Sequence, residues 1–370
     1  MRTLVASLLL ALVPSIAHAD DNDAADLVVL DGGFAQVTLM GLLQLEAVPY
    51  LGDDGLIVNG DPADAQGFSL RRARFGVRGY AWGDTEFELS MDASSEGMRL
   101  LDAWVAWRPI TGLGFVVGAR EVPFSRYALM RSSESALSDR PLGVRALAPF
   151  RQVGATIEGD VGNGIARYWL GVYNGLERRT SFGLGYEEAT ALDGNRFTRL
   201  AYAARAEVAP LGPVGDGMPD FERGGLRLGV GGSIYYDDGK SIETLGWEVD
   251  AIMKIAGFNL ALEWLNDSAE PTSQPTTDAT IPGAIDRSAL AAEAGYLFCG
   301  NKLGVAARVE LLDDNADLDN AGDQIVVSGG FQYYLHRQHM KALIELTHRE
   351  ELDGPSLDND ALLIQVQLGL

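Results

Sequence analysis

Arginine is concentrated in one part of a chain that is otherwise strongly acidic. The 370 residues include 29 Lys and Arg and 52 Asp and Glu, which gives a formal net charge of −23. Residues 68–151 nevertheless hold 12 basic and 9 acidic side chains, a balance of +3, so the remainder of the chain carries −26. Guanidinium groups bind carboxylate and phosphate oxygens through paired hydrogen bonds. If these arginines face one enclosed space, we expect a positive field that concentrates small anions.

Two segments carry most of these arginines. In the first, Arg72, Arg74 and Arg78 alternate with apolar residues, so they share one face of an extended strand. In the second, residues 121–150, small hydroxyl side chains separate the arginines; the residues concerned are Arg126, Arg131, Arg140 and Arg145, with Ser125, Ser132, Ser133, Ser135 and Ser138. Another interpretation stays open, in which the arginines pair with carboxylates and only fill a polar interior; the partners would be Glu86, Glu88, Asp92, Asp102 and Glu158.

The elements that must position these side chains show a period of two. In residues 361–370, Leu362, Ile364 and Val366 share one face, and the two glutamines of the segment fall on the other. Segments of about ten residues with this alternation are typical of strands that cross a membrane at a tilt. About sixteen such segments occur, an even number: 34–48, 68–81, 85–93, 99–108, 112–120, 151–160, 164–174, 197–209, 224–237, 241–255, 257–266, 287–299, 302–312, 323–335, 339–349 and 361–370.

The connections between these segments are alternately long and short, as they are in bacterial membrane barrels. With the N-terminus in the periplasm, the long outer connections are 49–67, 121–150, 175–196, 267–286, 313–322 and 350–360. The inner connection 210–223 is long and rich in Pro and Gly and breaks this rule, as do two short outer connections at 94–98 and 238–240. A soluble β-sandwich fits less well, because its strands are mostly about five or six residues long.

The sequence therefore predicts an all-β fold, an antiparallel transmembrane β-barrel of about sixteen strands with short periplasmic turns and long outer loops. A lipid-facing charge costs about 2 to 4 kcal/mol at mid-membrane, so the charged faces of the strands are expected to line the lumen. The longest connection, 121–150, is the third outer loop, and we predict that it folds into the lumen and narrows it.

The N-terminal residues predict export. Residues 1–19 combine Arg2, an apolar run and an Ala17-His18-Ala19 end, which is the layout of a cleaved secretory signal peptide. We expect a short periplasmic N-terminal segment at 20–33 and a barrel domain at 34–370. No later run is long and apolar enough for a membrane-spanning helix.

Several short motifs lie in and around the arginine-rich part of the chain: Arg71-Arg72-Ala73-Arg74, Leu101-Asp102-Ala103-Trp104, Gly118-Ala119-Arg120-Glu121, Arg151-Gln152-Val153-Gly154 and Tyr168-Trp169-Leu170-Gly171. Together they resemble the phosphate-selective porin O and P family of Gram-negative outer membranes. The resemblance implies a sixteen-stranded trimeric porin whose third loop enters the pore and whose basic residues bind anions at the constriction. This chain differs in having Glu121 where many members have lysine, and Leu370 in place of a terminal aromatic residue.

By position, the resemblance assigns Arg71, Arg72 and Arg74 to the constriction and Asp92 to the neighbouring strand. The third loop contributes Ser125, Arg126 and Arg131. With the remaining arginines of this region, the predicted anion contacts are Arg71, Arg72, Arg74, Asp92, Arg120, Ser125, Arg126, Arg131, Arg140 and Arg145. We expect a water-filled channel for small hydrophilic solutes that prefers anions such as phosphate or similar oxyanions. It would be a homotrimer in the outer membrane, in contact with lipid and lipopolysaccharide.

Other functions have less support. The alternatives are a non-selective or cation-preferring porin and, less favoured, a barrel enzyme or a structural outer-membrane protein. No nucleophile or acid–base set is grouped at one rim, so we expect neither an enzyme nor a cofactor. The net negative charge disfavours nucleic acid. One weak metal candidate comprises Asp313, Asn315, Asp317 and Asp319, which place oxygen ligands at alternate positions. The glycine and the closing glutamate of a calcium loop are absent from it.

Overall fold

The structure, a computed structural model, describes residues 27–52, 66–94, 97–176, 197, 199–272, 283–320, 322–354, 356 and 358–370, and for 27–30 it describes the backbone only. The expected signal peptide at 1–19 and residues 20–26 of the expected periplasmic segment lie outside the described residues. Among the residues described, no helix has the length and apolar character needed to cross a membrane.

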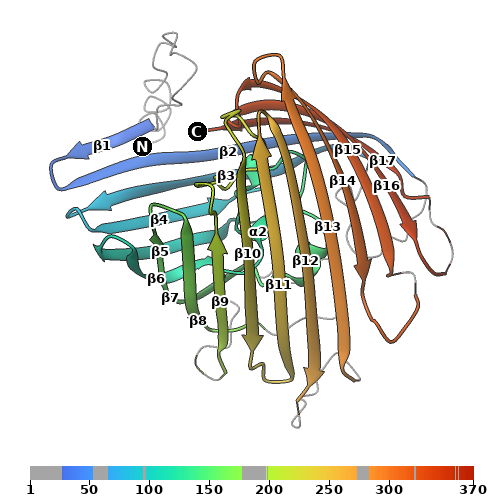
Figure 1. Cartoon of the computed structure of the whole chain (residues 1–370), viewed down its shortest axis with the longest axis horizontal. Coiled ribbons are helices and arrows are strands. Elements are labelled where there is room, and N and C mark those ends of the chain that lie inside the picture. The colour runs from blue at the N-terminus through green and yellow to red at the C-terminus, as the bar shows by residue number, and fades with distance from the viewer. Residues whose placement is uncertain are drawn as a thin grey trace.

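Sixteen antiparallel strands form a closed barrel (Figure 1). Each strand pairs with its neighbours in sequence, and the last strand, β17, pairs with β2 to close the ring. The first eight strands are β2 (Ala35–Leu51), β3 (Gly67–Ala81), β4 (Thr85–Asp92), β5 (Arg99–Ile110), β6 (Leu113–Glu121), β7 (Arg151–Val161), β8 (Ala166–Tyr173) and β9 (Ala201–Val208). The other eight are β10 (Arg227–Asp237), β11 (Ile242–Ile255), β12 (Phe258–Pro271), β13 (Ile285–Phe298), β14 (Leu303–Asp313), β15 (Gln324–His336), β16 (Met340–Glu351) and β17 (Ala361–Gly369).

All sixteen predicted strands are confirmed, with two boundary errors of more than three residues. Strand β9 begins at Ala201 rather than at 197, and β12 continues to Pro271 rather than ending at 266. Strand β1 (Leu27–Gly32) was not predicted, because its six residues are too few to show an alternation. This strand pairs with the first residues of β2, and β17 pairs with the rest of the same edge.

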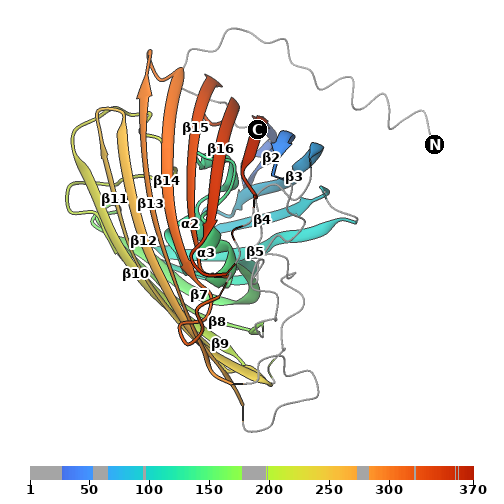
Figure 2. The ribbon, with the colours of Figure 1, turned by 90° about the vertical axis from the view of Figure 1, so that its right-hand side faces the viewer.

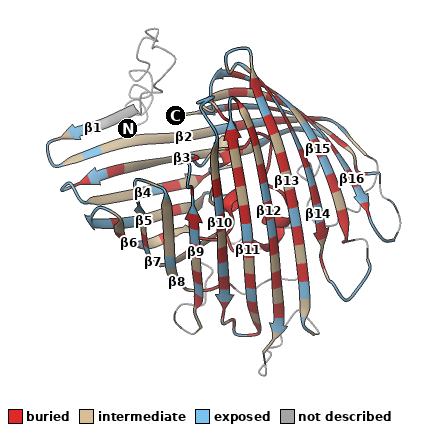
Figure 3. Ribbon diagram, in the orientation of Figure 1, coloured by how far each residue is buried: buried red, intermediate tan, exposed pale blue. Residues whose placement is uncertain are grey.

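The two faces of the strands differ as a membrane requires (Figure 3). In β17, Ile364, Val366 and Leu368 are exposed on the outer face, whereas Gln365 and Gln367 are buried inside the barrel. The same alternation of exposed apolar and buried residues repeats along β11, β14 and β16. The charged faces therefore line the lumen, as predicted, because a charge facing lipid would lose its hydration.

The third outer loop lies inside the ring of strands (Figure 2). It carries α2 (Arg126–Leu129), the 3-10 helix η1 (Ser132–Glu134) and α3 (Leu142–Leu147). Residues 122–128 and 135–150 are buried. Helices this short are unstable in isolation, so their conformation depends on the barrel wall against which they pack.

A charge placed on the outer face should destabilise the barrel. Val309 points outward near the middle of β14 and is 44% exposed. We expect Val309→Arg to lower the free energy of unfolding by about 2 to 4 kcal/mol, because the guanidinium would lie in hydrocarbon. Denaturant titration of protein refolded into lipid vesicles measures the change. Leu318→Arg, in an outer loop, is the control, and equal stabilities for the two variants would contradict our assignment of the outer face.

Candidate functional site

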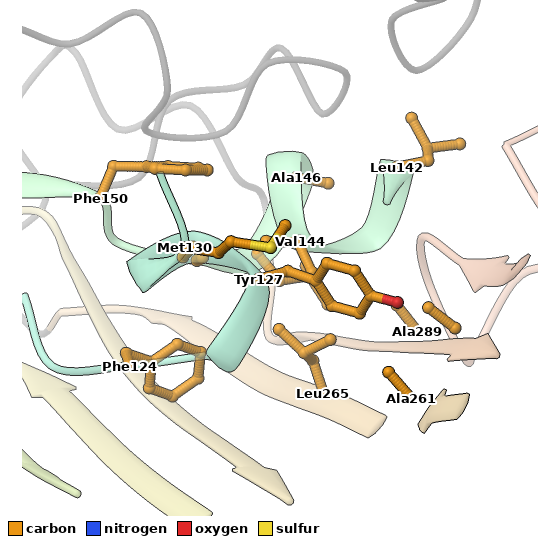
Figure 4. Packing of buried hydrophobic residues seen from close by; sticks show 14 of the residues in the cluster. Phe124, Tyr127, Met130, Leu142, Val144, Ala146, Phe150, Ala261, Leu265 and Ala289 are labelled. Carbon is orange, nitrogen blue, oxygen red and sulfur yellow. The ribbon is translucent and has the colours of Figure 1, made fainter. Parts of the chain in front are cut away.

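Apolar packing holds the third loop against one side of the barrel (Figure 4). Tyr127 and Val144 of the loop belong to the same buried cluster as Leu265 of β12. Helix α3 approaches β13 so closely that a Cβ added to Gly143 would lie 2.1 Å from the Cβ of Ala289. This contact explains why α3 has a glycine at a position where helix propensity favours almost any other residue.

The loop also covers carboxylates of the wall formed by β10 to β16. The backbone amide of Tyr127 donates to Glu263 at 3.2 Å, and that of Ser138 donates to Glu345 at 2.7 Å. The amide of Leu142 donates to Glu310. Each amide binds one carboxylate oxygen without adding positive charge, and Glu310 is in addition paired with Arg308 at 2.6 Å, so the loop removes an acidic surface from the open lumen.

The far side of the loop is tied to β3 through Asp139. Both Arg71 and Arg72 form ion pairs with this carboxylate. Consecutive residues of a strand normally point to opposite faces. Here the register pairs Arg72 with Gln44 and then Leu70 with Leu45, so it passes over Arg71, which is the extra residue of a β-bulge. Desolvation of Asp139 opposes its ionisation, yet the guanidinium groups of Arg71, Arg145 and Arg72 hold its pKa well below the usual value.

An open cavity of about 450 Å³ remains between the third loop and the wall formed by β2 to β9. Nine arginines and five carboxylates line it, a balance of +4. The arginines are Arg74, Arg78, Arg120, Arg126, Arg131, Arg140, Arg151, Arg167 and Arg205. The carboxylates are those of Glu88, Asp102, Glu121, Glu207 and Asp216. The lining itself is therefore richer in arginine than in carboxylate, and Asp92, Glu158, Glu248 and Asp250 lie directly behind it in ion pairs with lining arginines.

Most of the cavity arginines form ion pairs. Nitrogen–oxygen distances are 2.5 Å for Arg78–Glu88, 2.9 Å for Arg74–Asp92, 2.7 Å for Arg120–Glu158 and 3.1 Å for Arg151–Asp102. Glu86 pairs with Arg108 at 3.1 Å. All five carboxylates proposed as partners from the sequence are thus paired. By contrast, Arg131 is exposed to the cavity and has no ion pair with any residue that the structure describes.

The predicted anion contacts fall into two groups. Five of them line the cavity: Arg74, Arg120, Arg126, Arg131 and Arg140. The other five are not among its lining residues and support it instead: Arg71, Arg72, Asp92, Ser125 and Arg145. Ser125, for example, caps α2 by accepting a hydrogen bond from the amide of Ala128 at 3.0 Å.

Four arginines that line the cavity were not among the predicted anion contacts: Arg78, Arg151, Arg167 and Arg205. Arg78 carried a usable signal, because it continues the alternation of Arg72 and Arg74 on β3. Arg167 and Arg205 had only their inward position on β8 and β9, and only closure of the barrel brings those strands to the arginine-rich segment. Two inward tryptophans, Trp104 and Trp169, were also missed.

The weak metal candidate is not assembled as predicted. The carboxylate of Asp313 accepts from the amide of Asn315, and the side chain of Asn315 accepts from the amide of Asp317, so these residues form local turns. Only Asp319 of the four joins a group of carboxylates, and its neighbours there, in the described part of the chain, are Asp323 and Asp353.

A family model described as phosphate-selective porin O and P matches residues 53–220. No curated protein sequence matches the chain. Among solved structures, the anion-selective porin from Comamonas acidovorans has a TM-score of 0.60 at 14% identity, covering 91% of this chain and 100% of that one. The outer membrane protein OmpT of Vibrio cholerae, trimer form, gives 0.57 at 14% identity, covering 91% and 100%. OmpF of Salmonella typhi, in complex with daunomycin, gives 0.58 at 14%, covering 93% and 100%.

The closed sixteen-stranded ring, its apolar exterior and its charged lumen define a porin-type β-barrel of the Gram-negative outer membrane. The family match over residues 53–220 is consistent with the resemblance to the phosphate-selective porin O and P family that the arginine-rich motifs indicated. This family and fold are those of a channel rather than an enzyme.

Gly143 should be essential for docking of the third loop. We expect Gly143→Ala to force α3 away from Ala289 and to reduce stability by about 1 to 3 kcal/mol, because the well-packed wall cannot give way. Bilayer recordings should show noisier open-channel current as the loop loosens. Gly329→Ala on β15 is the control, because its added Cβ would meet no atom within 4 Å. A quiet, fully stable Gly143→Ala channel would contradict the close approach.

Asp139 should anchor the loop across a wide pH range. Because its folded-state pKa lies well below its ordinary value of 3.8, the ionised carboxylate stabilises the loop fully above about pH 4, and this contribution is lost only as pH falls through the folded-state pKa. We expect wild-type current noise to be the same at pH 7 and pH 4.5, and Asp139→Asn to be noisier at both. Asp317→Asn, in an exposed loop, should match the wild type. Equal noise in all three proteins would show that the ion pairs do not hold the loop.

Proposed function

We propose that this protein is an outer-membrane diffusion channel for small hydrophilic solutes that prefers anions. The observation that carries the preference is the lining of the cavity, where nine arginines face five carboxylates. The third loop strengthens this imbalance, because it covers Glu263, Glu310 and Glu345 on the opposite wall. An ion in the lumen therefore passes close to more cations than anions.

Confinement makes a small surplus of charge effective. A narrow aqueous space between low-dielectric walls focuses the field of the side chains that line it, so a small local surplus of positive charge raises the local anion concentration. Arg131 contributes most directly, because its guanidinium is exposed to the cavity and no described carboxylate is paired with it. The paired arginines contribute as well, because more arginines than carboxylates line the cavity.

Small oxyanions are the solute class that this lining fits, since guanidinium groups bind carboxylate and phosphate oxygens in the same geometry. Glu121 moderates the preference. Its carboxylate lies 3.0 Å from Arg151 and 3.6 Å from Arg140, at the position where many family members have lysine. We therefore propose that phosphate and small carboxylates pass through the cavity without tight binding.

The ion pairs of the lumen favour one alternative, a non-selective or cation-preferring porin, since paired arginines attract anions less than free ones do. We propose in addition a homotrimer in contact with lipid and lipopolysaccharide, exported by means of a signal peptide at 1–19 and carrying no enzymatic activity. The trimer form of the similar OmpT barrel supports this assembly.

Reversal potentials in a salt gradient test the anion preference. We expect chloride to be favoured over potassium, Arg131→Ala to lower the permeability ratio about fivefold, and Glu121→Gln to raise it about fivefold, because one unit charge about 8 Å from the ion in water changes the energies of chloride and potassium by about 0.5 kcal/mol in opposite directions.

Arg199→Ala provides the matched control. Arg199, whose side chain is 31% exposed, pairs with Asp238 outside the cavity lining, so its loss should leave the ratio unchanged. A preference for potassium in the wild-type channel would overturn the anion proposal.

A further inference from the structure

The connection between β9 and β10, residues 209–226, enters the barrel from the end that carries the short turns. It contains the inner connection 210–223, which is long where the alternation of long and short connections requires a short turn. Val214, Met218 and Asp220 are only 4%, 1% and 1% exposed. A periplasmic turn that merely joined two strands would stay in solvent, so this one has a defined position inside the barrel mouth.

The base of the connection is fixed to neighbouring turns at the same end of the barrel. The carboxylate of Asp220 accepts from the amide of Gly257 at 2.8 Å and pairs with Arg227. The side-chain amide of Asn301 donates to the carbonyl of Phe221 at 2.7 Å. These contacts bind the segment to the β11–β12 and β13–β14 turns and restrict its movement.

The tip of the connection meets the third loop, which comes from the opposite end of the barrel. The amide of Met218 donates to the carbonyl of Glu134 at 3.1 Å, and Lys254 donates to the carbonyl of Gly217. Asp216 lines the same cavity as the loop arginines; its side chain is 62% exposed and lies 2.8 Å from Arg167. The cavity is thus bounded from both ends.

We propose that residues 209–226 form a second constriction of the pore, and that Asp216 at its tip is a selectivity-determining residue that limits anion preference by neutralising Arg167. The inference rests on the channel function proposed above. Arg167 is held independently of Asp216, because it also pairs with Glu207 at 2.8 Å and lies over the ring of Trp169 at 5.5 Å. Removing the Asp216 charge therefore leaves a cation in place beside the ion path.

The charge arm of the test compares two isosteric variants in reversal-potential measurements. Asp216→Asn should raise the chloride-to-potassium permeability ratio about fivefold, because one unit charge close to the ion path acts on chloride and potassium in opposite directions. Glu222→Gln is the matched control on the same connection, since Glu222 is 71% exposed and is not a cavity-lining residue, and it should leave the ratio unchanged. Equal ratios for the two variants would refute the role of Asp216.

The steric arm uses the single cysteine of the chain. In a Cys299→Ser background, Asp216→Cys is treated with a bulky thiol reagent, and single-channel conductance is recorded before and after. We expect conductance to fall by about a third or more, because the added group would occupy the constriction. The same treatment of Glu222→Cys should have no effect. If modification at position 216 leaves the conductance of open channels unchanged, the second constriction alone is refuted. If the Cys299→Ser protein forms no channels, the channel function is refuted as well.

Discussion

Hydrocarbon offers no water to a strand, so every backbone amide and carbonyl in the membrane must find its partner within the chain. This constraint closes the ring, because β2 and β17 would otherwise each expose an unpaired edge to lipid. It also imposes the period of two, since each strand has lipid on one side and the lumen on the other. Charged side chains at mid-membrane must therefore face the lumen, and the electrostatics of the interior follow from the geometry of the wall.

The interior that results has two unlike walls, and the third loop acts differently on each. Along β10 to β16 it lays apolar residues and backbone amides over buried carboxylates, which would be costly to leave without hydrogen bonds. Along β3 it places one carboxylate, that of Asp139, between arginines. The loop is thus held by the arginines of β3 on one wall and, on the other, by carboxylates together with Arg308 and Lys341, which donate to its carbonyls. The space that it leaves open adjoins the basic wall, which is why the cavity and the whole chain differ in the sign of their charge.

The strands were predictable because each one carries its own local signal, a repeated alternation that lipid on one side enforces. The cavity was predictable only in part. Arg74 and Arg131 lie within the arginine-rich region, but Arg167 and Arg205 reach the cavity through closure of the ring, which no short window of sequence reveals. Arg71 faces the loop through a bulge, and the period of two assigns it to the wrong side. The 210–223 connection was recognised as irregular, yet its position depends on hydrogen bonds to turns far away in sequence.

Ion pairing and a positive cavity are compatible because the carboxylates of the lumen are shared. Asp139 and Glu207 each lie within ion-pair distance of three arginines, and Glu121 and Glu158 each lie within that distance of two. One carboxylate can orient several guanidinium groups but neutralises the charge of only one. Several arginines are shared in the same way, because Arg126, Arg151 and Arg167 each lie within that distance of two carboxylates and Arg205 of three. The pairs therefore fix the arginines in position, and the surplus that an ion meets is that of the residues lining the cavity. Net charge counts every residue of the chain equally, whereas an ion in the lumen responds to charges within about 8 Å at physiological salt, so an acidic protein can hold a basic pore.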